Sequence, residues 1–115
     1  MDFKIVEWKC RMDIRDLAAG EVDSGTKCPI ARALGRRLQP SFEVVVGSDD
    51  VWIVYAATGS TIHHQKLPQF AREFTRAFDA GHRPPPISFT LAAPREFLRK
   101  NQRAKRRNFL SSEKK

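Results

Sequence analysis

The sequence has no long apolar run and few cysteines. No stretch approaches the roughly 18 consecutive apolar residues of a membrane-spanning helix, and the first residues lack the basic-then-apolar order of a secretory signal. The two cysteines, Cys10 and Cys28, lie far apart, and a disulfide between them would be unusual in a reducing compartment. We therefore expect a cytoplasmic protein with no membrane contact and no disulfide.

Metal-binding and catalytic motifs are also missing. The three histidines and two cysteines do not have the spacing of a zinc site, and His63 and His64 should leave a strand on opposite faces. No nucleophile, general base and orienting group can be named together. The sequence thus predicts a protein that is not an enzyme and has no metal and no cofactor.

What the chain does have is enough apolar residues for one core and an uneven distribution of charge. Its 115 residues are 41% hydrophobic, which suits a single domain. Residues 94–115 contain nine Lys or Arg and two Glu, whereas residues 1–93 contain twelve Lys or Arg and eleven Asp or Glu. We predict a nearly neutral domain over residues 1–93 and a basic tail over residues 94–115, whose loose apolar stripe is compatible with a helix.

Apolar spacing and turn residues predict mixed helices and strands. Strands are expected over residues 3–12, 42–46, 51–57, 61–66 and 87–91, one or two helical turns over 13–20, and longer helices over 28–38 and 67–81. The turn formers at residues 47–50 predict a hairpin, the strongest local signal in the chain. The fold class is therefore α+β: a small antiparallel sheet, formed by a β-meander and the terminal strands, packed by two helices.

The loop over residues 20–27 superficially resembles a phosphate-binding P-loop. That loop needs Lys directly after its second Gly and a hydroxyl residue after the Lys, but Thr26 and Lys27 stand in the reverse order. A weaker anion site stays open, because Ser24, Thr26 and Lys27 precede a helix whose first N–H groups attract negative charge. Capping of the helix is the more common role for such residues.

Cys28, at the start of the same predicted helix, is a candidate nucleophile. The helix dipole favours the thiolate, although no general base is near in the sequence. A small buried cysteine that begins a packed helix is several times more common, so the structural role is favoured.

The basic tail has the clearest physical consequence. If about six of its cations displaced phosphate counterions, the binding constant for duplex DNA would fall with salt at a logarithmic slope near −5. Docking to an acidic protein or simple solubility are the alternative roles of such a tail. The residues predicted to contact nucleic acid or a partner are Arg99, Lys100, Arg103, Lys105, Arg106 and Arg107.

Several short segments occur in an order that resembles small uncharacterised bacteriophage proteins. The main ones are CPIARAL at residues 28–34, FDAG at residues 78–81 and PISF at residues 86–89. The resemblance covers about residues 12–91 and leaves out most of the basic tail. It implies a phage or prophage accessory protein that acts against a host system in the host cytoplasm, and it implies no activity.

The leading hypothesis is a non-enzymatic phage-type accessory protein that binds nucleic acid, or an acidic host complex that handles nucleic acid in defence, through its basic tail. The chief alternative is a homo-oligomeric anti-defence protein that sequesters a small anionic nucleotide signal. The second alternative is a cysteine-dependent enzyme centred on Cys28.

Overall fold

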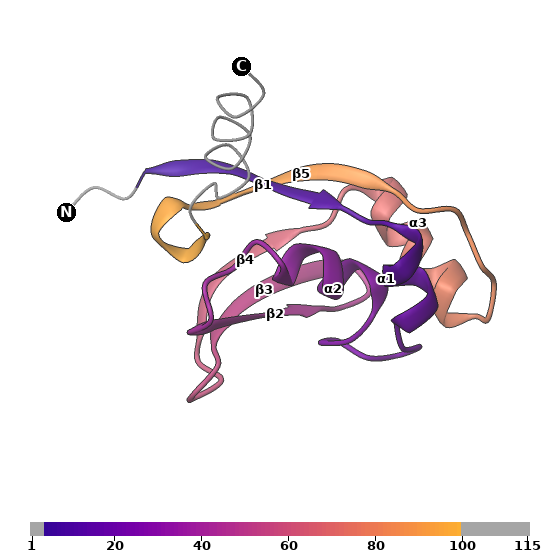
Figure 1. The fold of residues 1–115 in the computed structure, drawn as a ribbon, viewed down its shortest axis with the longest axis horizontal. Helices are drawn as coiled ribbons and strands as arrows, with labels where there is room; N and C mark the ends of the chain where they lie inside the picture. Colours follow the sequence, from indigo (N-terminus) through magenta and orange to yellow (C-terminus); the bar gives the residue numbers. More distant parts are fainter. Residues whose placement is uncertain (1–3, 100–115) are drawn as a thin grey trace, which may run out of the picture.

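A computed structural model describes residues 4–99, which form three α-helices and two antiparallel sheets (Figure 1). The elements are β1 (Ile5–Arg11), α1 (Ile14–Ala19), α2 (Pro29–Gly35), β2 (Phe42–Val46), β3 (Asp50–Tyr55), β4 (Thr61–Lys66), α3 (Gln69–Asp79), β5 (Ser88–Pro94) and the 3₁₀ turn η1 (Arg95–Phe97). This architecture confirms the predicted α+β class. No helix within residues 4–99 is long and apolar enough to cross a membrane.

Strands β2, β3 and β4 form the predicted meander. The N–H of Gly47 donates to the carbonyl of Asp50 over 2.8 Å and closes the first hairpin. Gly59 occupies the second turn with a φ of +77°, a conformation that costs glycine little. The local turn signals therefore placed both hairpins correctly.

The terminal strands form a sheet of their own. β1 pairs antiparallel with β5 from Ile5 opposite Pro94 to Arg11 opposite Ser88. The sequence predicts one sheet for all five strands, but main-chain hydrogen bonds divide them into sheets of three and two. The Gln65 side chain of β4 links the two sheets. Its Nε2 donates to the Ala92 carbonyl of β5, and its Oε1 accepts from the Ala92 N–H.

The core lies between the sheets and the helices, and Trp8 is at its centre. Trp8 is fully buried, and its indole Nε1 donates to the Leu34 carbonyl of α2 over 3.2 Å. Figure 1 shows α2 over the meander, with α1 and α3 towards the same end of the molecule. The largest fully buried apolar side chains are Trp8, Phe78, Ile30, Leu34, Ile53, Val51, Pro29 and Cys10.

The packed part of the chain extends beyond the expected boundary at residue 93. α2 ends at Gly35 rather than at residue 38, which leaves Leu38 extended and paired in a β-bridge with Leu98. Leu98 is 7% exposed and belongs to the core. Residues 95–97 form only the short turn η1, and the rest of the helix expected after Pro94 lies outside the described residues.

Candidate functional site

A fully buried carboxylate, Asp16, lies in the first turn of α1. Its backbone N–H donates to Oδ1 of the N-cap residue Asp13, and Asp16 Oδ2 in turn accepts from the Asp13 N–H, both over 3.0 Å. This reciprocal capping box satisfies two main-chain donors at the start of the helix. The spacing of the two aspartates thereby fixes the position of the buried carboxylate.

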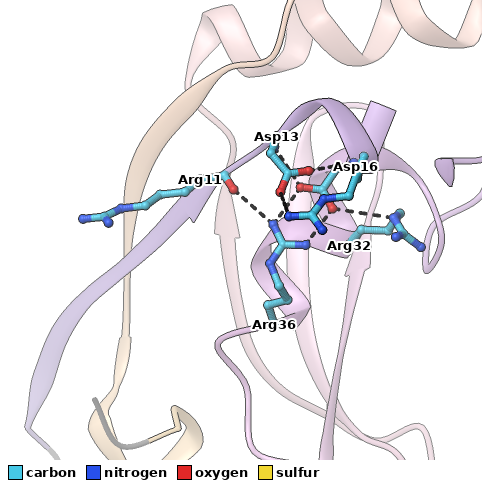
Figure 2. Close-up of polar contacts among 6 residues, drawn as sticks. Arg11, Asp13, Asp16, Arg32 and Arg36 are labelled. Atoms are coloured by element: carbon cyan, nitrogen blue, oxygen red, sulfur yellow. Dashed lines mark hydrogen bonds and ion pairs between the residues drawn. The ribbon is translucent and has the colours of Figure 1, made fainter. Parts of the chain in front are cut away.

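Arg36, at the end of α2, binds this carboxylate through both arms of its guanidinium. Nη1 donates to Asp16 Oδ1 over 2.6 Å and Nη2 donates to Oδ2 over 2.7 Å, as Figure 2 shows. Nη2 also donates to the main-chain carbonyl of Arg11 over 3.1 Å, and Arg32 Nε lies 3.6 Å from Asp16 Oδ1. One ion pair thus ties together α1, α2 and the end of β1.

The pair is ionised at neutral pH. Burial raises the pKa of Asp16, but the hydrogen bonds from Arg36 and Asp13 and the charges of Arg36 and Arg32 outweigh it, so the net pKa is lowered. The hydrogen bond to Asp16 correspondingly raises the pKa of Arg36. The Asp16 side chain has no exposed surface, whereas Arg36 is 48% and Arg32 is 39% exposed. Solvent therefore meets the guanidinium groups and not the carboxylate beneath them.

More arginines adjoin this ion pair. The N–H of Arg99 donates to the Arg37 carbonyl over 2.7 Å, so the end of the described chain lies beside the end of α2. On the other side, Arg15 of α1 is 88% exposed and only 3.8 Å from Asp13. We call this set the arginine surface: Arg15, Arg32, Arg36, Arg37 and Arg99.

Sequence reasoning found one residue of the arginine surface, Arg99, and missed the others. Asp16, Arg32 and Arg36 were not among its candidates, although the Asp-x-x-Asp spacing of a capping box and the four-residue spacing of the arginines were visible. The remaining predicted contact residues lie outside the described residues: Lys100, Arg103, Lys105, Arg106 and Arg107.

The second predicted site, at the start of α2, has its polar groups engaged in a turn. The Ser24 hydroxyl accepts from the Lys27 N–H over 3.0 Å, and the Ser24 carbonyl accepts from the Cys28 N–H over 3.2 Å. The side chains of Thr26 and Lys27 are exposed, and α2 has only seven residues. Ser24 therefore stabilises the turn before α2, and no side chain caps the first turn of this helix.

A cavity of about 200 Å³ opens beside this turn, between the loop, the β2–β3 hairpin and α3. Two carboxylates line it: Asp79, whose Oδ1 accepts from the Asp23 N–H over 2.9 Å, and Asp23 itself, at a φ of +55°. Such a lining repels phosphate. The cavity therefore counts against an anion or nucleotide site at this end of α2.

Cys28 also lines this cavity. The side chain is 6% exposed, and burial raises its pKa despite main-chain hydrogen bonds that act in the opposite direction. Within residues 4–99, no hydrogen bond joins Cys28 to a histidine: His63 contacts Ala92, and His64 stacks on Trp52. A raised pKa disfavours the thiolate that a cysteine nucleophile requires.

Within residues 4–99, no group of three or more His, Cys, Asp or Glu side chains lies close enough to share a metal ion. No family model, curated protein or solved structure matches the chain.

Proposed function

We propose that the protein is a non-enzymatic nucleic-acid-binding protein whose basic tail and arginine surface together contact the phosphate backbone. The observation that carries the proposal is the antiparallel bridge between Leu38 and Leu98, beside which the Arg99 N–H donates to the Arg37 carbonyl. Because both leucines are buried, Arg37 and Arg99 lie on the opposite face of this bridge, where Arg99 is exposed and Arg37 is half-buried. Arg99 of the tail therefore lies beside Arg37, the next residue in the chain after Arg36.

The buried ion pair supports the same function. Arg36 is held by two hydrogen bonds to Asp16, so its half-exposed guanidinium loses little further freedom when it meets a phosphate. Contacts between arginine side chains and the phosphates of nucleic acid position a protein without reading the base sequence. Together with the bacteriophage resemblance, this favours nucleic acid, or a host complex that handles it, in the host cytoplasm as the target.

Fluorescence anisotropy of labelled duplex and single-stranded DNA, measured across a salt series, tests the proposal. For the full chain we expect a steep loss of affinity with salt, at a logarithmic slope near −5 for about six phosphate contacts. Replacing the five cations from Lys100 to Arg107 with Gln should remove most of that slope. Truncation after Arg99 is the cleaner deletion than one at residue 93, because it keeps the buried Leu98.

Single substitutions test whether the arginine surface takes part. Arg37→Gln should reduce the slope by about 1, because one phosphate contact is lost. The matched control is Arg83→Gln, which removes the same charge from an exposed side chain that lies over the Phe78 ring of α3. Equal effects of the two variants, or no binding by the full chain near physiological salt, would rule the proposal out.

A further inference from the structure

Within the described residues, one edge of β1 is paired with β5, and the other edge makes no hydrogen bond to another main-chain group. The N–H of Met12 donates to the Ile87 carbonyl, and the Lys4 carbonyl accepts from the Arg95 N–H, so even-numbered residues direct their main-chain groups towards β5. The odd-numbered residues of β1 direct theirs away from β5. Within residues 4–99, this outer edge has one hydrogen-bond partner, the Arg36 side chain at the Arg11 carbonyl.

The side chains along this outer edge are exposed and carry opposite charges. Ile5 is 57% exposed, and the side chains of Glu7 and Lys9 are 73% and 40% exposed. Glu7 and Lys9 lie 3.8 Å apart on the same face, whereas Trp8 between them points into the core. An accessible strand edge of this kind is a template for pairing with another strand.

We propose that β1 pairs antiparallel with β1 of a second copy of the chain, so that two ribbons join into one four-stranded sheet. The charges select the register, with Glu7 opposite Lys9 of the second copy. The two-fold axis then places Lys9 opposite Glu7 of the second copy, and each such pair is of opposite charge. A shift of two residues would place Glu7 opposite its own equivalent, which is unfavourable.

The same register brings together main-chain groups that need partners. Residues 7 and 9 are both odd-numbered, so their outward N–H and C=O groups face one another and exchange hydrogen bonds. The assembly also stops at two copies, because Gln65 occupies the Ala92 main chain on the outer edge of β5. A closed dimer, and not an open filament, follows from this asymmetry of the two edges.

Sedimentation equilibrium of the full chain at about 50 mM salt, where surface charges are weakly screened, tests this pairing. The wild type should dimerise, and Glu7→Lys or Lys9→Glu should each weaken the dimer by roughly tenfold or more, because every facing pair becomes like-charged. The double variant Glu7→Lys/Lys9→Glu should recover the dimer. Glu21→Lys, the same charge change in an exposed loop, is the control and should dimerise like the wild type.

A main-chain variant is compared with one that makes the same charge change. Lys9→Pro and Lys9→Gln both remove the positive charge, but only Lys9→Pro also removes an N–H that points away from β5. Lys9→Pro should therefore abolish the dimer and leave the β1–β5 ladder and the circular dichroism spectrum unchanged, whereas Lys9→Gln should only weaken the dimer. The proposal fails if the wild type is monomeric at about millimolar concentration, far above the dissociation constants of specific dimers. It also fails if the double variant does not recover, or if Lys9→Pro folds and still dimerises.

Discussion

The two ends of α2 both lie close to carboxylates, yet they present opposite charges to solvent. At the C-terminal end, the Asp16 carboxylate is buried beneath Arg36 and Arg32, and only the guanidinium groups are exposed. At the N-terminal end, Asp23 and Asp79 line an open cavity, and the hydrogen bond between them comes from a main-chain N–H and not from a cation. The charge presented to solvent thus depends on whether the carboxylate is covered by arginines, as at Asp16, or lines an open cavity, as at Asp79.

This contrast agrees with the direction of the helix dipole. The carbonyl end of a helix favours cations and the N–H end favours anions, so both ends of α2 already have complementary side chains from the protein itself. A dipole argument alone predicts an anion site at the start of α2. An anion is disfavoured there because Asp23 and Asp79 line the cavity beside Cys28, at the start of the helix.

The largest effect should come from neutralising one carboxylate at each end. Asp16→Asn removes the charge that two arginines surround, and breaking such a buried pair should lower the free energy of unfolding by about 3 kcal/mol. Asp79→Asn keeps an acceptor for the Asp23 N–H and removes a negative charge from the end of α3, so its effect should stay within about 0.5 kcal/mol. Urea denaturation at pH 7 measures both.

An additional pair of variants separates geometry from charge. Arg36→Lys keeps the cation but loses the two-armed contact with Asp16, whereas Arg15→Lys changes a side chain that is 88% exposed. We expect a clear loss of stability only for Arg36→Lys. For the aspartate variants above, similar losses of unfolding free energy in Asp16→Asn and Asp79→Asn would show that the two ends of α2 do not differ energetically.

A smaller effect should appear in the pH dependence of stability. The folded-state pKa of Asp16 is lowered, so the unfolded chain binds its proton first as the pH falls. The stabilisation from this carboxylate is therefore present above about pH 4, the ordinary range of an aspartate, and is lost as the pH falls through the folded-state value. Urea midpoints between neutral and acidic pH should fall steeply for the wild type and less steeply for Asp16→Asn.

Local features of the fold could be predicted from the sequence. The turn residues at 47–50, the N-cap Asp13 and the helix stop at Gly81, with a φ of +96°, each act on neighbouring residues, and the structure has all three. The pairing of β1 with β5 and the burial of Leu98 depend on residues far away in the chain. Periodicity contains no information about such contacts, which explains why the sequence predicts one sheet where the structure has two.

The arginine surface was missed for the same reason. Arg36 is twenty residues from Asp16, and only the fold brings the two together. Sequence patterns assign Arg32 and Arg36 to the polar face of α2, which is correct for their exposure but does not reveal the buried partner. Conversely, the positive charge of the tail was evident because it depends on composition alone.

The smallest effect concerns the thiols near α2. Burial, followed by the Asp16 charge, raises the pKa of Cys10 to about 12, and burial also raises the pKa of Cys28. Both cysteines are free and buried, with exposures of 0% and 6%. At pH 8 both should react with iodoacetamide more slowly in the native protein than in urea, and Cys28 should be the faster of the two.

The Asp79 carboxylate, near the N-terminal end of α2, provides a further test of these alkylation rates. The charge of Asp79 raises the pKa of Cys28, so Asp79→Asn should increase the alkylation rate of Cys28 slightly and leave that of Cys10 unchanged. Mass spectrometry of peptides after timed alkylation resolves the two sites. Rapid, selective alkylation of Cys28 in the wild type would contradict the raised pKa, and it would restore the cysteine-enzyme hypothesis because the dipole of α2 would then outweigh both burial and Asp79.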